Sequence, residues 1–240
     1  MKKALIALSV IAALFAGCRE ETLKPKVIYD ARTAKSQPKK ADSTQIKVAD
    51  LPILMEGTKY LIHPVGDIRI YDDSNRSYGT SRTNSSVSYA ISNYNRFEIT
   101  GYFQNLKFQH VDSTALRPLT DRKIQIQTAT YLNTIADKTK KQILLYTLVD
   151  ADTNRDGKVD ANDIKSLYIS SSNGTRFTKL SQDVQELVDW NVIDAQNRVY
   201  FRTIEDINKN GAFDKNDMVH YHYADLLSPE WTVTDYKPVE

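Results

Sequence analysis

Short stretches in which apolar and polar residues alternate recur along most of this chain. They are rich in β-branched and aromatic residues, which favours strands over helices. The clearest stretches are residues 60–62, 68–71, 96–99, 123–126 and 198–201. Polar turn sequences separate them, at residues 72–75, 171–174 and 194–197. No long helical period is evident, and residues 182–190 fit two helical turns or a strand equally well. The pattern predicts an all-β domain over residues 51–236.

Three segments of this domain resemble one another in sequence. Each contains an alternating strand, a polar turn and a second short strand. They are residues 106–120, 166–181 and 219–233. A further predicted strand precedes each, at residues 96–103, 143–149 and 198–204. A unit of three or four strands that returns about every 50 to 60 residues predicts repeated small antiparallel sheets.

These units resemble the blades of TolB-like β-propellers, in which a strand and a turn of the Asp-Gly kind are followed by Arg-x-Leu-Thr. The first two units likewise carry an arginine and close with Leu-Thr or Leu-Ser. The resemblance covers residues 88–233 and implies a propeller-like arrangement. Because three units do not close a propeller, a fourth would need the strands within residues 51–78. Without a fourth unit, a three-sheet open assembly or a β-sandwich is expected.

Residues 152–163 have the sequence DTNRDGKVDAND, which places acceptor side chains at every second position before and around Gly157. Calcium binds six to eight oxygen ligands, and a tight loop supplies them in this spacing. The predicted ligands are Asp152, Asn154, Asp156, the Lys158 carbonyl, Asp160 and Asp163. The pattern resembles an EF-hand loop, except that the last ligand is Asp instead of Glu, as it is in dockerin modules. The alternative is a polar hairpin turn, because Asp, Asn and Gly are common turn residues.

Residues 206–217, DINKNGAFDKND, repeat the same spacing around Gly211. The predicted ligands are Asp206, Asn208, Asn210, the Ala212 carbonyl, Asp214 and Asp217. This loop has three carboxylates where the first has four, so its calcium affinity is expected to be lower. Two such loops at equivalent points of two repeats predict two calcium sites.

The segments that flank both loops alternate like strands. An EF-hand or a dockerin module instead needs a helix leaving the loop, here after Asp163 and after Asp217. We therefore expect both loops to be β-hairpin connections, and their calcium to add stability to the fold. A dockerin-like adhesion module remains an alternative and would require those helices.

The first 17 residues place two lysines before a short apolar segment that ends in small residues, which is typical of a secretory signal peptide. The sequence FAGC that ends at Cys18 resembles the lipobox of bacterial lipoproteins, which implies cleavage before Cys18 and lipidation of it. Residues 18–50 are rich in Lys, Ser, Thr and Pro and predict a flexible tether, with a short strand at residues 26–29. Arg19, Glu20 and Glu21 at the start of this tether resemble the surface-export signal of Bacteroidetes lipoproteins, and the alternative is an ordinary solvated start of the tether. Cys18 is the only cysteine, so no internal disulfide can form.

The whole chain contains 32 basic and 30 acidic residues, and its excess of positive charge lies in the two lysines of the signal. The mature charge is therefore balanced and gives no reason to expect a nucleic-acid partner. No nucleophile elbow, phosphate-binding glycine loop or zinc-protease motif is present. His220 and His222 would share one strand face, either as metal ligands or as ordinary sheet residues.

The favoured function is that of a non-enzymatic, calcium-stabilised lipoprotein of the bacterial outer membrane. It would face the periplasm or the cell surface and bind a protein or glycan partner. The alternative is a hydrolase of envelope polymers, which would need a carboxylate or histidine cluster in a cleft.

Overall fold

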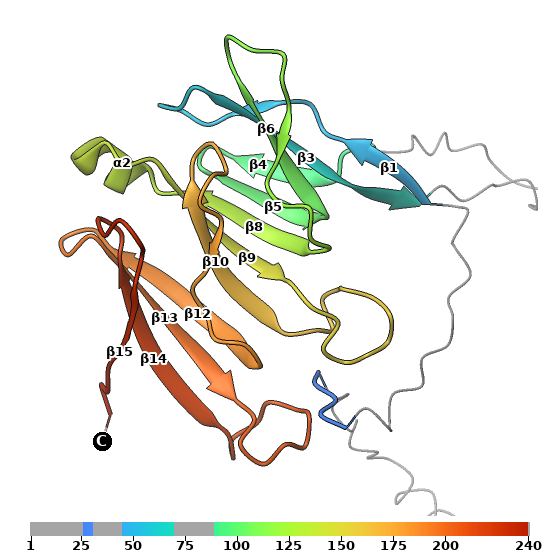
Figure 1. Ribbon diagram of the computed structural model, residues 1–240, viewed down its shortest axis with the longest axis vertical. Coiled ribbons are helices and arrows are strands. Elements are labelled where there is room, and N and C mark those ends of the chain that lie inside the picture. The colour runs from blue at the N-terminus through green and yellow to red at the C-terminus, as the bar shows by residue number, and fades with distance from the viewer. Residues whose placement is uncertain (1–25, 31–44, 70–88, 240) are drawn as a thin grey trace, which may run out of the picture.

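A computed structural model describes residues 26–30, 45–69 and 89–239 of the chain, and the signal peptide and Cys18 lie outside these ranges. The described residues form three antiparallel sheets and one short helix, so the predicted all-β class is confirmed (Figure 1). In the part of the chain that the structure describes, none of the three sheets closes into a barrel.

The first sheet has the strand order β1-β3-β6-β7, and β2 pairs with β3. Its strands are β1 (Gln45–Ala49), β2 (Ile53–Leu54), β3 (Tyr60–Arg69), β6 (Asn105–His110) and β7 (Arg117–Pro118). Strand β1 pairs with β3 along its whole length, from Gln45 opposite Arg69 to Ala49 opposite Val65. The described part of this sheet therefore includes residues 45–49, which lie inside the range predicted for the tether.

The second sheet has the order β11-β10-β9-β8-β5-β4. Its strands are β4 (Ser92–Asn95), β5 (Glu98–Phe103), β8 (Gln125–Tyr131), β9 (Ile143–Val149), β10 (Lys165–Ser171) and β11 (Thr178–Lys179). The helix α2 (Asn133–Thr139) connects β8 to β9. The sequence did not predict this helix. The predicted strand at residues 96–99 is corrected too, since Arg96 and Phe97 form the β4–β5 turn and Arg96 has a φ of 27°.

The third sheet has the order β12-β13-β14-β15. Its strands are β12 (Gln185–Ile193), β13 (Arg198–Glu205), β14 (Met218–Asp225) and β15 (Val233–Asp235). Strand β12 resolves the choice that the sequence left open at residues 182–190 in favour of a strand.

The three repeats are visible as equivalent strand pairs, β6–β7, β10–β11 and β14–β15. In the first two, a buried leucine of the short strand region donates its N–H to a buried leucine of the long strand. Leu119 N bonds Leu106 O at 2.8 Å, and Leu180 N bonds Leu167 O at 2.8 Å. In the third pair, Val233 lies opposite Ala224.

The first repeat differs from the prediction in its preceding strand. The sequence predicts that the strand at residues 96–103 belongs with the unit at residues 106–120. Strand β5 instead lies in the second sheet, between β8 and β4. Strand β3 takes the place beside β6. The described strands within residues 51–78, β2 and β3, thus belong to the first sheet and form no fourth blade, so the described residues form the three-sheet open assembly.

The second sheet is the middle layer of the molecule, because both its faces are buried. On β9, Leu144, Tyr146 and Leu148 pack into the core shared with the first sheet. Ile143 and Leu145 pack into the core shared with the third sheet. Burial on both faces explains why β9 is an almost continuous apolar run. Each fully buried large side chain of this kind stabilises the fold by about 1.5–3 kcal/mol.

Candidate metal centres

Both predicted loops connect neighbouring antiparallel strands, as expected. Residues 152–163 lie between β9 and β10, which pair up to Val149 opposite Lys165. Residues 206–217 lie between β13 and β14, where Glu205 is opposite Met218. The two loops lie on one side of the molecule, and residues 26–30 lie between them (Figure 1).

In the first loop, the side chains at positions one, three and five turn inward and accept hydrogen bonds from the loop backbone. Asp156 N donates to Asp152 Oδ1 at 3.0 Å, and Gly157 N donates to Asp152 Oδ2 at 2.8 Å. Asn154 Oδ1 accepts from Asp156 N at 3.0 Å, and Asp156 Oδ1 accepts from Lys158 N at 2.8 Å. The loop is therefore wound around its own oxygen-bearing side chains.

The second loop repeats these bonds position by position. Asp206 Oδ1 accepts from Asn210 N at 3.2 Å, and Asp206 Oδ2 accepts from Gly211 N at 2.6 Å. Asn208 Oδ1 accepts from Asn210 N at 2.9 Å, and Asn210 Oδ1 accepts from Ala212 N at 2.8 Å. Outside the predicted ligands the two loops share only Gly at position six and Asn at position eleven, so the shared winding follows the ligand pattern together with these two residues.

The backbone conformation of the two loops also agrees. Position six is glycine in both, with φ of 81° at Gly157 and 86° at Gly211. Position four is left-handed too, with φ of 56° at Arg155 and 57° at Lys209. Glycine adopts positive φ without the steric cost that a side chain brings, which explains its place at the sharpest part of the turn.

The closing aspartate accepts one equivalent backbone hydrogen bond in each loop, at Oδ2. Asp160 N donates to Asp163 Oδ2 at 3.0 Å, and Asp214 N donates to Asp217 Oδ2 at 2.7 Å. Asp163 is fully buried, and its Oδ1 also accepts from Thr153 N at 2.8 Å. Among the described residues no lysine or arginine forms an ion pair with Asp163. A buried carboxylate without a cationic partner is a site that a metal cation would stabilise.

The carboxylates bond to backbone amides and do not converge on one point. In residues 26–30, 45–69 and 89–239, no three His, Cys, Asp or Glu side chains form a metal-binding group. The predicted ligand set also contains amide and main-chain oxygens, Asn154 and Lys158 in the first loop and Asn208, Asn210 and Ala212 in the second. The donor set consists only of oxygens, which fits a hard cation such as calcium.

The loops also have neighbours that the sequence did not indicate as part of a site. Thr153 Oγ1 donates to Lys26 O at 2.7 Å, 127 positions earlier in the chain. Lys26 Nζ forms an ion pair with Glu186 at 2.9 Å. Partial burial and the neighbouring Asp206 carboxylate, to which its hydroxyl donates a hydrogen bond, raise the pKa of Tyr29 to about 12. Such contacts between distant positions leave no local sequence signal.

The two strand histidines have separate partners. His222 is buried, with Nε2 at 3.0 Å from Thr203 Oγ1 and Nδ1 at 2.7 Å from Asp235. His220 Nε2 lies 2.8 Å from Glu205. Each ring is therefore held by its own oxygen partners in the third sheet.

A carboxylate before the first loop anchors it to the second sheet. Asp150 accepts hydrogen bonds from the Tyr168 hydroxyl at 2.7 Å and from Ser166 at 3.3 Å, and pairs with Lys179 at 2.8 Å. Burial alone would raise the pKa of Asp150, but the bonds from Lys179, Tyr168 and Ser166 outweigh it and hold this pKa below its usual value.

This network predicts a pH-dependent part of the stability. Because the pKa of Asp150 is lower in the folded chain than in the unfolded chain, its contribution is complete above the unfolded pKa and is lost as pH falls through the folded pKa. In calcium-free urea unfolding at pH 6 and pH 3, Asp150→Asn should lose less stability on acidification than the wild type. Asp183→Asn is the control, because Asp183 also pairs with Lys179 but is 86% exposed. Equal losses in the wild type and Asp150→Asn would contradict the assignment.

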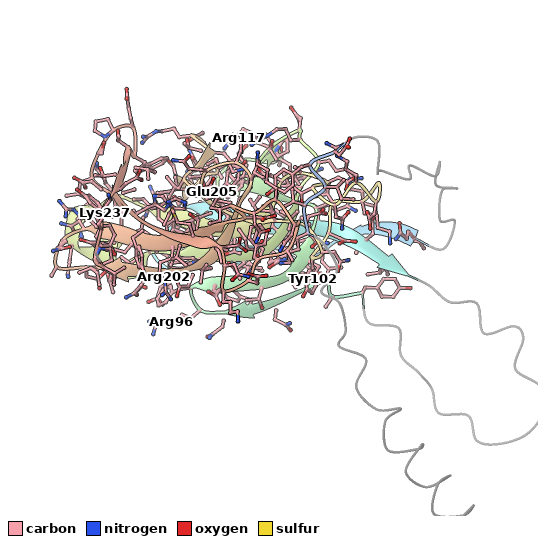
Figure 2. The ribbon with its side chains drawn as sticks, turned by 90° about the horizontal axis from the view of Figure 1, so that it is seen from below. Arg96, Tyr102, Arg117, Arg202, Glu205 and Lys237 are labelled. Carbon is pink, nitrogen blue, oxygen red and sulfur yellow. The ribbon has the colours of Figure 1, made fainter. Side chains whose placement is uncertain are left out.

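A polar cleft of about 600 Å³ lies between the first and second sheets, next to the first loop. It is lined by amide, carboxylate and cationic side chains, among them Gln104, Asp67 and Arg122. Tyr102, which is labelled in Figure 2, belongs to the same lining. Its side chain is 65% exposed. Gln125 Oε1 is buried there, and no described residue donates a hydrogen bond to it. The cleft offers hydrogen-bonding groups to a polar ligand.

No family model matches this chain, and no curated protein matches it either. In the part of the chain that the structure describes, none of the helical segments has the length and apolar character needed to cross a membrane.

Proposed function

We propose that residues 152–163 and 206–217 each bind one calcium ion, and that this calcium stabilises a non-enzymatic binding domain. The observation that carries the proposal is the shared hydrogen-bond network of the two loops. The network repeats at the same positions although, between the predicted ligands, the loops share only Gly at position six and Asn at position eleven. A polar hairpin turn requires one or two such bonds, whereas both loops here have the bonds to the side chains at positions one, three and five and the Oδ2 bond of the closing aspartate.

The ligands are the oxygens predicted from the sequence. Asp152, Asn154, Asp156, Asp160 and Asp163 would hold the first ion together with the Lys158 carbonyl. Asp206, Asn208, Asn210, Asp214 and Asp217 would hold the second together with the Ala212 carbonyl. Bound calcium supplies positive charge that offsets the repulsion among the carboxylates, and the binding free energy adds to the stability of the fold.

The protein would act at the bacterial outer membrane, attached through lipid on Cys18. Its partner would be a protein or a glycan, and the polar cleft beside the first loop supports a partner rich in hydrogen-bonding groups. Gln125 Oε1 would gain a donor from such a ligand, which removes the cost of a buried acceptor without a partner.

Calorimetric titration of calcium into the full chain in detergent tests the proposal. The wild type should show two binding events, the weaker from the second loop. Asp152→Ala should lose the tighter event and Asp206→Ala the weaker one, because each removes the first ligand of one loop. Titration with magnesium is the control for a general divalent-cation effect. Absence of saturable heat with millimolar calcium would refute the proposal.

A further inference from the structure

Residues 26–30, the clasp segment, lie across both loops. Lys26 N and Val27 N donate to the carbonyl of Gly211, at 2.6 Å and 3.1 Å. Ile28 N donates to the carbonyl of Thr153 at 2.9 Å. Gly211 is position six of the second loop and Thr153 is position two of the first. One short segment therefore bonds to the backbone of both candidate sites.

Side-chain contacts of the clasp segment also hold it against the loops and the third sheet. Val27 is only 6% exposed. Lys26 Nζ bonds Glu186 on β12 at 2.9 Å, and Glu186 also accepts from Lys165 N, just after the first loop, at 2.9 Å. Tyr29 lies beside the carboxylate of Asp206, the first predicted ligand of the second loop. The segment is thus held by packing, by an ion pair and by a ligand residue.

The clasp segment contacts the groups that calcium would order. Thr153 Oγ1, which donates to Lys26 O, lies 3.2 Å from Asp163 Oδ1, the closing ligand oxygen of the first loop. Gly211 is buried in the second loop, whereas the equivalent Gly157 of the first loop is exposed. The segment therefore covers the turn of the second loop and reaches the ligand shell of the first.

We propose that residues 26–30 form a calcium-dependent clasp that joins the two loops. This inference rests on the proposed calcium sites. Its bonds to Gly211 and Thr153 exist only when both loops have their wound conformation, so ions that stabilise the loops also stabilise the docked clasp. The linkage is reciprocal, and a docked clasp must raise the calcium affinity by the same factor.

Docking changes the reach of the proposed lipid anchor. Cys18 lies eight residues before Lys26 but 27 residues before Gln45. An extended chain spans at most about 3.5 Å per residue. The greatest distance from Cys18 to the folded domain is therefore roughly 30 Å with the clasp docked and roughly 95 Å with it released. Calcium would hold the loop side of the domain close to the membrane surface.

The test is calcium titration of the full chain in detergent, comparing the wild type with Val27→Asp. A carboxylate at this buried position should release the clasp and weaken calcium binding by about fivefold or more. Leu51→Asp is the matched control, because Leu51 is 86% exposed and should leave the affinity unchanged. Lys26→Met, which removes the ion pair with Glu186 without burying a charge, should weaken binding in the same direction. Circular dichroism confirms that each variant keeps its strands.

Hydrogen exchange measures the clasp itself. Calcium should slow exchange of the Val27 and Ile28 amides in the wild type but not in Val27→Asp. Equal calcium affinity in the wild type and Val27→Asp would overturn the clasp while leaving the calcium sites intact. Calcium binding without slower exchange at these amides would overturn it too. No calcium binding by the wild type would instead refute the proposed function, and the inference with it.

Discussion

Saturating calcium is expected to raise the midpoint of thermal unfolding of the wild-type chain by about 5–10 °C. A ligand at one hundred times its dissociation constant adds about 2.7 kcal/mol when it binds only the folded state. A domain of this size gains about 2–4 °C for each kcal/mol. This shift is expected from calcium in the first loop alone. Calcium in the second loop should raise the midpoint further at higher calcium concentrations. Differential scanning calorimetry with calcium or with a chelator measures the shift.

The control is the double variant Asp152→Ala with Asp206→Ala. It lacks the first ligand of each loop, so calcium and chelator should give it the same midpoint. A calcium shift as large in the double variant as in the wild type would show that the loops are not its source. No shift in the wild type would show that calcium does not bind the folded state preferentially.

Gly174→Ala is expected to destabilise the chain by about 2–4 kcal/mol, since it combines left-handed strain with overpacking. Gly174 lies in the β10–β11 turn with φ of 74°, and a Cβ there would lie 2.9 Å from Phe108 Cζ and closer still to two other ring atoms. Phe108 is buried on β6, so this contact joins the first and second sheets. Urea unfolding measures the loss.

Gly57→Ala separates the two causes. Gly57 has a similar φ of 85°, but a Cβ there would meet only the Tyr131 hydroxyl, at 3.9 Å. It should therefore show the conformational cost alone, about 1–2 kcal/mol. Equal losses in the two variants would contradict the close packing of Gly174 on Phe108.

Local patterns were enough to predict the strand class and the hairpin position of both loops. The alternation in residues 198–201 and the apolar run in residues 143–149 each correspond to an observed strand, because burial of one or both faces fixes the pattern. The repeat of the leucines at 106 and 167 likewise reflects equivalent strand pairs.

The features that the sequence did not indicate depend on distant contacts or on short elements. Strand β5 joins the second sheet through pairing with β8, a choice that no pattern within residues 96–103 specifies. Helix α2 has no side-chain cap at Leu132 and no acidic residue in its first turn, so the usual start signals are missing. The sequence predicts a short strand at residues 26–29, but the clasp segment contains no strand and is held by distant contacts such as that of Lys26 with Glu186, 160 positions away.

The number of calcium ions bound per chain tests the central claim most directly. Native mass spectrometry of the full chain should show two calcium ions on the wild type, one on Asp152→Ala or Asp206→Ala, and none on the double variant. A wild-type chain that carries no more calcium than the double variant would contradict the account, and both loops would then be polar hairpin turns.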